Sequence, residues 1–347
     1  MKQLKISPAQ KQRRKRWMMA TLVVCITLAM VGGSLHVLKL GALRMNEMQS
    51  KASYDVNDMG SRIRAAGEEL YLHEYNENQS AGTQTYSPEE AQALLTAEQW
   101  LDFTSMVTIP AGIFTMGTDD NRSNDPNKPA HLVQVKAFKI DKYPVTQAAY
   151  ARFIAENRYR IPLNWTEGRI PNGILLQPVT MVSWYNARDY CAWVGKRLPT
   201  EAEWEKAARG TDARRWPWGS AMHPENLNTY YKVGHITDVN AYPQGASPYG
   251  VMDMSGNVQE WIADEFSPYP GTTASKEVFQ AKELDPTYHR GSEEKERVIY
   301  FVMRGGSWKS DPFSTTAYHR NFSMPNYASD FFGFRCAMNI EQEESQP

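Results

Sequence analysis

Tryptophan recurs in the second half of this chain inside short strings rich in glycine and proline, and this recurrence limits the folds open to it. Residues 195–205 read GKRLPTEAEWE, residues 216–219 read WPWG, and residues 304–308 read RGGSW. Glycine and proline interrupt regular structure, whereas each tryptophan can bury a large ring. With 22 Gly, 20 Pro and 10 Trp in the chain, the pattern predicts a loop-rich domain packed around large aromatic side chains.

Capping boxes predict where helices begin. Thr200 is followed three residues later by Glu203, and Ser87 is followed by Glu90 in the same way. In such a pair, each side chain accepts a hydrogen bond from the other residue's backbone N–H at the start of a helix. We therefore expect a helix from Thr200 onward, and a leading helix over residues 87–104.

The first 40 residues combine a basic run with a long apolar stretch. Residues 1–16 carry lysine and arginine and no acidic residue, and residues 17–38 are almost uncharged. About 20 apolar residues in a helix span a hydrocarbon core of ~30 Å. The positive-inside rule then predicts a single-pass protein of the inner (cytoplasmic) membrane, with a cytoplasmic N-terminus and a periplasmic or other extracytoplasmic main domain. A cleaved signal peptide is the alternative, although residues 30–34, MVGGS, form a poor cleavage site.

Polar segments flank the expected main domain. Residues 39–86 carry mixed charge and scattered apolar residues, which predicts a membrane-proximal helical stalk and linker, and residues 341–347 form a polar tail. Residues 267–297 contain polar and charged runs typical of a solvated surface loop, where ligands often bind. The formal net charge is −1, so no global field favours nucleic acid as a partner.

The ending of the chain carries its most specific motif. Residues 304–310, RGGSWKS, closed by residues 333–337, GFRCA, resemble the end of the formylglycine-generating enzyme (sulfatase-modifying factor) domain. The similarity extends upstream through the strings quoted above. It implies an α+β fold of the C-type-lectin-like kind over residues 105–340, loop-rich, opening with an entry hairpin at residues 106–117.

The resemblance also exposes a chemical difference. In the active enzymes two cysteines between these strings bind copper(I) and oxidise a cysteine of the substrate, whereas the matching positions here are Ser310 and Thr315. Copper(I) is soft and prefers sulfur ligands such as thiolates, which hydroxyls cannot replace. We therefore expect no copper, no catalytic residue at these positions and no sulfatase-modifying activity.

Two cysteines lie beyond the predicted membrane span, Cys191 and Cys336. The resemblance implies that they form a structural disulfide, and an exported domain would meet an oxidising compartment. The alternative is a pair of buried free thiols.

The resemblance further implies one structural Ca²⁺ site, formed by Asp253, Gly256, Val258 and Glu260. Two carboxylates and two backbone carbonyls supply the oxygen ligands that this cation prefers. The alternative is a turn in which both carboxylates accept backbone hydrogen bonds.

Two classes of function fit these features. Cysteine-less relatives include exported regulators, so the first is a non-catalytic binding, accessory or regulatory protein of the cell envelope. Its protein or peptide partner would bind near Trp308 and Ser310, in the groove that corresponds to the substrate groove of the active enzymes. The second is a cysteine-independent oxidoreductase acting on an exported peptide or metabolite. Against it, none of the seven histidines forms an HxH, HxxxH or HxxE ligand pair.

Overall fold

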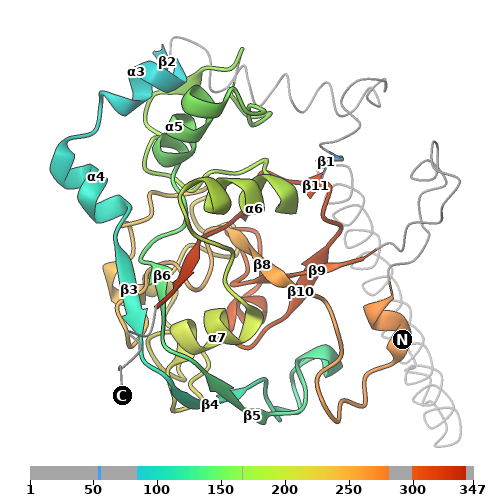
Figure 1. The fold of residues 1–347 in the computed structure, drawn as a ribbon. Helices are drawn as coiled ribbons and strands as arrows, with labels where there is room; N and C mark the ends of the chain where they lie inside the picture. The colour runs from blue at the N-terminus through green and yellow to red at the C-terminus, as the bar shows by residue number, and fades with distance from the viewer. Residues whose placement is uncertain (1–53, 56–83, 166, 281–298, 341–347) are drawn as a thin grey trace, which may run out of the picture. The chain divides into compact units, whose positions relative to one another are not determined.

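The computed structural model describes residues 54–55, 84–165, 167–280 and 299–340 (Figure 1). The predicted cytoplasmic tail, transmembrane helix and polar tail lie outside these residues, as does most of the predicted stalk. Within the described ranges, no helix combines the length and apolarity needed to cross a bilayer. The membrane anchor therefore stays a prediction.

The described residues form short helices and small sheets joined by long connections. The helices are α3 (Pro88–Gln92), α4 (Ala97–Phe103), α5 (Gln147–Asn157), α6 (Trp184–Trp193) and α7 (Glu201–Arg209). One sheet has the order β10 (Asn321–Ser323), β9 (Phe301–Arg304), β8 (Gln259–Glu265), β12 (Phe332–Gly333). A second has the order β13 (Ala337–Asn339), β6 (Phe138–Asp141), β3 (Met106–Ile109). Three strand pairs are β4 (Gly112–Met116) with β5 (His131–Val135), β2 (Thr85–Tyr86) with β7 (Ile170–Pro171), and β1 (Tyr54–Asp55) with β11 (Tyr327–Ala328).

The expected entry hairpin at residues 106–117 is wrong. Strand β3 pairs with β6, whereas β4 pairs with β5, so the two segments enter different sheets. The connection between them is held by the Lys206 ammonium, which donates to the carbonyls of Pro110 (2.6 Å) and Gly112 (3.0 Å). A long-range contact from α7 thus redirects the chain at the point where a hairpin would turn.

The single leading helix over residues 87–104 is also wrong, because the segment forms α3 and then α4. The break follows from a second capping box, in which Thr96 Oγ1 accepts from Gln99 N and Gln99 Oε1 accepts from Thr96 N. The Trp100 indole then donates to the Gln92 carbonyl, which joins the two short helices.

Helix α7 begins as predicted and lies at the centre of one of the hydrophobic cores. The box of Thr200 and Glu203 is complete, and Trp204 and Trp261 are fully buried. Trp216 is buried as well, whereas Trp184 and Trp308 retain partial exposure. These tryptophans therefore serve mainly, but not wholly, as core residues.

The disulfide is present in the structure, between Cys191 on α6 and Cys336 just before β13, with both cysteines fully buried. It closes a loop of 145 residues. In the chain-entropy model such a loop contributes on the order of 4–5 kcal/mol to stability.

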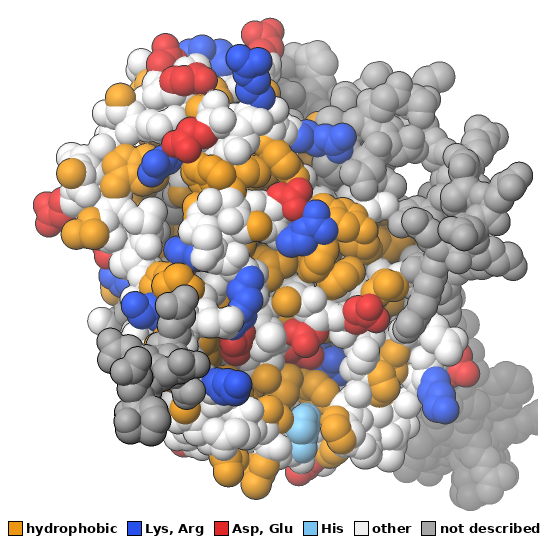
Figure 2. All heavy atoms as spheres, viewed as in Figure 1, with side chains coloured by type: hydrophobic (Ala, Val, Ile, Leu, Met, Phe, Trp, Pro, Cys, Tyr) orange, Lys and Arg blue, Asp and Glu red, His pale blue; other side chains and the backbone are white. Residues whose placement is uncertain are grey.

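Lysine, arginine and acidic side chains are interspersed on the face drawn in Figure 2. This mixture agrees with the formal net charge of −1. No large patch of one sign dominates that face.

Candidate functional site

A close turn presents the segment that resembles the thiol site of the active enzymes. Strand β9 ends at Arg304, and Gly305 (φ 90°) and Gly306 (φ 68°) both take left-handed backbone. A Cβ added at Gly306 would lie 2.7 Å from the Ser314 carbonyl oxygen. Only glycine therefore lets the chain pass so close to the segment that follows.

The two hydroxyls at the thiol positions are engaged in local structure. Ser310 Oγ accepts from the Ser307 backbone N–H at 2.9 Å. Thr315 is fully buried, and its Oγ1 donates to the Pro312 carbonyl (2.8 Å) and accepts from the Trp216 indole (3.3 Å). Both side chains thus stabilise the turn.

A cavity of about 210 Å³ adjoins this turn. Its lining includes Asp120, Asp311, Phe313, Ser314 and His319. Burial, reinforced by the nearby Arg304 guanidinium, lowers the pKa of His319 to about 4. The imidazole is therefore neutral at physiological pH, and it can donate or accept one hydrogen bond at each nitrogen. The sequence shows His319 nine residues after Ser310, but only the structure places it in this cavity.

Two exposed tyrosines flank the same turn, and no motif of the sequence identifies them. Tyr230 and Tyr231 both take left-handed backbone, at φ 52° and 57°. Their backbone N–H groups donate to the carbonyls of Ser310 (2.9 Å) and Trp308 (2.8 Å). The side chains nevertheless stay 66% and 49% exposed, and the rings of Tyr231 and Trp308 meet edge to face at 5.4 Å.

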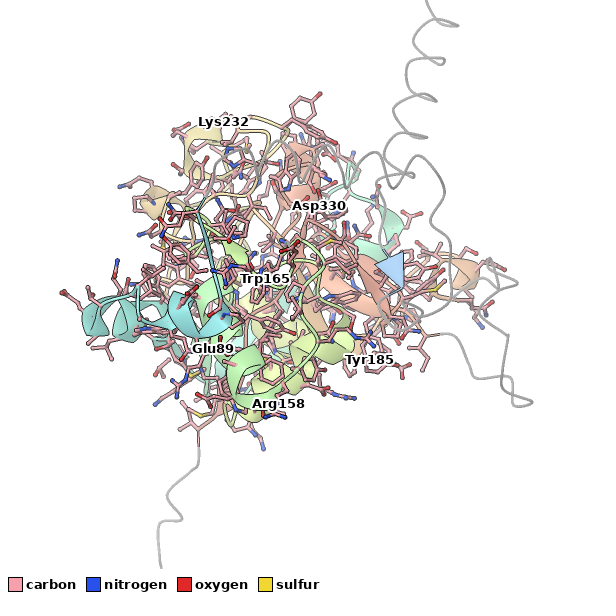
Figure 3. The ribbon with its side chains drawn as sticks, turned by 90° about the horizontal axis from the view of Figure 1, so that it is seen from above. Glu89, Arg158, Trp165, Tyr185, Lys232 and Asp330 are labelled. Carbon is pink, nitrogen blue, oxygen red and sulfur yellow. A yellow bond between two sulfur atoms is a disulfide. The ribbon has the colours of Figure 1, made fainter. Side chains whose placement is uncertain are left out.

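Left-handed backbone at a residue other than glycine costs on the order of 1–3 kcal/mol and concentrates at functional sites. Here that strained turn holds aromatic side chains in solvent beside Trp308. Lys232 follows the two tyrosines, and Asp330 pairs with Lys309 at 2.7 Å. Lys232 and Asp330 lie on the same side of the molecule in Figure 3. We call Trp308, Ser310, Tyr230, Tyr231 and the adjoining cavity the thiol-site surface.

The predicted calcium residues lie in a strained, buried turn. Asp253 (φ 55°) is buried, and Gly256 (φ 79°) could not carry a Cβ, which would lie 2.3 Å from the Asn228 carbonyl oxygen. Burial raises the pKa of Asp253 to about 7, and the charge of Glu260 adds to this rise. The structure thus brings the two predicted carboxylates close enough to interact.

Glu260 differs from Asp253 in having a cation of its own. Its oxygens accept from Arg335 Nη2 (2.6 Å) and Arg335 Nε (2.7 Å), and the Trp204 indole donates to the second oxygen at 2.8 Å. Asp253 accepts only from the uncharged Asn257 amide, at 2.9 Å, among the side-chain bonds that the structure gives it. Asp253 therefore fits a Ca²⁺ ligand well, and Glu260 fits one only if it shares an oxygen with Arg335.

Comparison with known proteins finds a matching family model and a solved structure with a similar fold. Residues 91–340 match the family model described as "Sulfatase-modifying factor enzyme 1-like domain". The solved structure of PvdO from Pseudomonas aeruginosa superposes with a TM-score of 0.55 at 24% identity, covering 74% of this chain and 98% of that one. This second match concerns the fold alone.

Curated relatives share about a third of their aligned residues with the chain. The inactive C-alpha-formylglycine-generating enzyme 2 of Bos taurus is 32% identical over 307 residues, which cover 70% of this chain and 92% of that protein. Hercynine oxygenase of Mycolicibacterium smegmatis is 32% identical over 67% of this chain and 61% of its own length. Serine/threonine-protein kinase pkn1 of Chlamydia pneumoniae is 32% identical over 68% of this chain but only 38% of its own length.

Proposed function

The chain belongs to the sulfatase-modifying factor enzyme 1-like family, and we propose that it is a membrane-anchored envelope protein whose domain binds a protein or peptide partner. In this proposal the domain does not oxidise a substrate cysteine. It acts as a binding, accessory or regulatory module outside the cytoplasmic membrane.

The observation that carries the proposal is that neither thiol position holds a cysteine. Ser310 and Thr315 offer hydroxyls that are hydrogen-bonded within their own turn. The remaining cysteines of the predicted exported part, Cys191 and Cys336, are joined in a disulfide. The active enzymes of the family hold copper(I) with a thiolate pair, and Ser310 and Thr315 offer no such pair at the matching positions. A relative described as inactive within the same family supports the same conclusion.

The thiol-site surface supports partner binding at that place. Exposed tyrosine and tryptophan rings supply large contact area at a small loss of side-chain entropy, and they dominate many protein interfaces. Phe313, which lines the adjoining cavity, is 60% exposed and extends this aromatic surface. A partner segment could cover the rings and enter the cavity with a polar side chain.

Site-specific photocrosslinking in the native cell envelope tests the proposal. A photoreactive residue at Phe313 or Tyr231 should give one discrete adduct, because these side chains lie on the thiol-site surface. The control places the same residue at Leu132, which is 73% exposed on β5. Adducts of equal yield from Leu132, or none from Phe313 and Tyr231, would contradict partner binding at this surface.

A structural Ca²⁺ ion completes the proposal. Asp253 would hold it together with the carbonyls of Gly256 and Val258, and Glu260 would contribute an oxygen that it shares with Arg335. The ion would neutralise the buried Asp253 carboxylate and fix the turn. This residue set does no redox chemistry.

The alternative is a cysteine-independent oxidoreductase, and the similarity to hercynine oxygenase favours it. Among the described residues, no group of three or more His, Cys, Asp and Glu side chains is arranged to hold a metal ion. His319 is the histidine that lines the cavity beside Ser310. If this alternative holds, stoichiometric iron or copper in the purified chain and loss of that metal on His319→Gln are the expected results.

A further inference from the structure

A second and larger cavity lies away from the thiol-site surface and shares no lining residue with it. Its volume is about 650 Å³, and it opens where the segment before α7 separates from β13. Arg197 and Ala337 form a β-bridge, and the Asn339 side-chain oxygen accepts a hydrogen bond from Arg197 Nε at 3.0 Å. A Cβ added at Gly195 would meet no atom within 4 Å, so this wall faces open space.

Cationic side chains from two separate segments line this cavity, which we call the basic cavity. Lys139 comes from β6, and Lys196 and Arg197 come from the segment before α7. The aliphatic side chains of Met338 and Ile340 complete the lining. A volume in this range suits a small ligand or a few residues of a peptide.

The charged groups of the basic cavity and their partners carry one excess positive charge, which belongs to Lys139. Lys196 pairs with Asp141 at 2.6 Å, and Arg197 forms a bidentate pair with Glu203 at 2.7 Å. Three cations less these two carboxylates leave a formal charge of +1. The Lys139 ammonium has no hydrogen bond or ion pair to a described residue, and Lys196 keeps ammonium N–H groups beyond the one directed at Asp141.

We propose that the basic cavity binds a glutamate-rich peptide segment. Glutamate carboxylates would accept from Lys139 and Lys196, and the aliphatic part of each glutamate would pack on Met338 and Ile340. The chain itself carries one such segment, because residues 341–344 read EQEE and follow directly after Ile340. The same chemistry could come from this run or from another protein, and the experiment separates the two sources.

The test measures fluorescence anisotropy of a labelled peptide with the sequence of residues 340–347, IEQEESQP, added to the purified full chain. A matched peptide with glutamine at the three glutamate positions is the charge control. We expect the glutamate peptide to bind and its affinity to fall as salt screens the contact. Lys139→Gln should weaken binding about two- to fivefold, the effect of one lost solvent-exposed ion pair.

The control variant is Lys136→Gln, which removes the same charge from an exposed lysine outside the basic cavity. It should bind the peptide as the unmodified chain does. Equal binding of the glutamine peptide, equal affinities of the Lys139 and Lys136 variants, or no binding to any form of the chain would overturn the proposal.

A chain that ends at Ile340 identifies the source of the segment. Tighter peptide binding to this shortened chain than to the full chain would assign the cavity to residues 341–344, because a tethered segment competes at high effective concentration. Equal binding to both forms would assign it to an acidic segment of another protein. Neither result depends on the thiol-site surface, so the partner proposal above can fail separately.

Discussion

At the scale of single residues, the contacts of Glu260 and Asp253 decide how well each residue fits the predicted calcium site. Glu260 is matched to a cation site by its motif, yet Arg335 and Trp204 already bind it. Asp253 has no such cation and is left with a raised pKa. The sequence could identify both residues, but it could not show that a guanidinium 75 positions away neutralises one of them.

Asp253→Ala, which removes the side-chain oxygen ligands altogether, tests the calcium site more cleanly than any change at Glu260. Ca²⁺ should raise the unfolding temperature of the unmodified chain and leave that of the variant unchanged, since binding to the folded state adds about 2.7 kcal/mol at 100 times the Kd. Glu260→Gln should destabilise the chain with or without chelator, because Arg335 is then buried without a carboxylate. Equal calcium responses of the unmodified chain and Asp253→Ala in differential scanning calorimetry would rule out the assignment.

His319 predicts a pH dependence of stability. Its folded pKa of about 4 lies below the ordinary value of 6.5, so between these values the unfolded chain binds the proton and the folded chain does not. Stability should therefore be complete above about pH 6.5 and fall as the pH drops towards 4. His319→Gln should show a shallower fall in urea unfolding series, whereas the exposed His223→Gln should keep the original slope. Identical slopes in all three proteins would contradict this prediction.

Restoring the thiols tests whether the turn retains the family geometry. The double variant Ser310→Cys with Thr315→Cys should bind about one copper(I) under reducing conditions, because paired thiolates select this ion. The unmodified chain should bind none at these positions. Copper titration followed by ultraviolet thiolate absorbance measures both. Absence of copper binding in a double variant that still folds would show that the two positions do not converge here.

At the scale of secondary-structure elements, local signals predicted helix starts, and long-range contacts decided the rest. The capping boxes at Ser87 and Thr200 are present as predicted. The entry hairpin failed because Lys206 and the pairing of β3 with β6 redirect the chain, and neither contact is local. The strained turn at Tyr230 and Tyr231 could not be predicted either, since its cause is two backbone hydrogen bonds to residues about 80 positions away.

Helix α7 carries an ion network that predicts a large loss of stability on substitution. Glu205 is fully buried and accepts from Arg209 Nη1 (2.7 Å), Gly117 N (2.8 Å) and the Arg304 guanidinium. Glu205→Gln leaves the buried Arg209 guanidinium without a carboxylate and leaves Arg304 only the Glu201 carboxylate, 3.8 Å away. This should cost about 3–5 kcal/mol in urea unfolding.

The control for this prediction is Glu156→Gln, which removes an exposed partner of Arg152 on α5. A surface pair of this kind contributes about 0.3–0.5 kcal/mol. Similar losses from the two variants would mean that the Glu205 network is not the stabilising feature described.

At the scale of the whole molecule, the family motifs predicted the domain and its disulfide, while the structure supplied the surfaces. The strings around Trp204, Trp216 and Trp308 identify the scaffold because they encode its turns. The thiol-site surface and the basic cavity arise from segments distant in sequence, so no single string predicts them. These two features of a scaffold that lacks the thiol pair are therefore identified from the structure and not from the sequence.

The metal content of the purified full chain tests the central claim most directly. Elemental analysis after isolation without added metals should find calcium near one equivalent and neither copper nor iron above trace amounts. That result would agree with a binding module on a scaffold that has lost its oxidative ligands. Stoichiometric copper or iron would contradict it and make His319 and Ser310 the next residues to substitute.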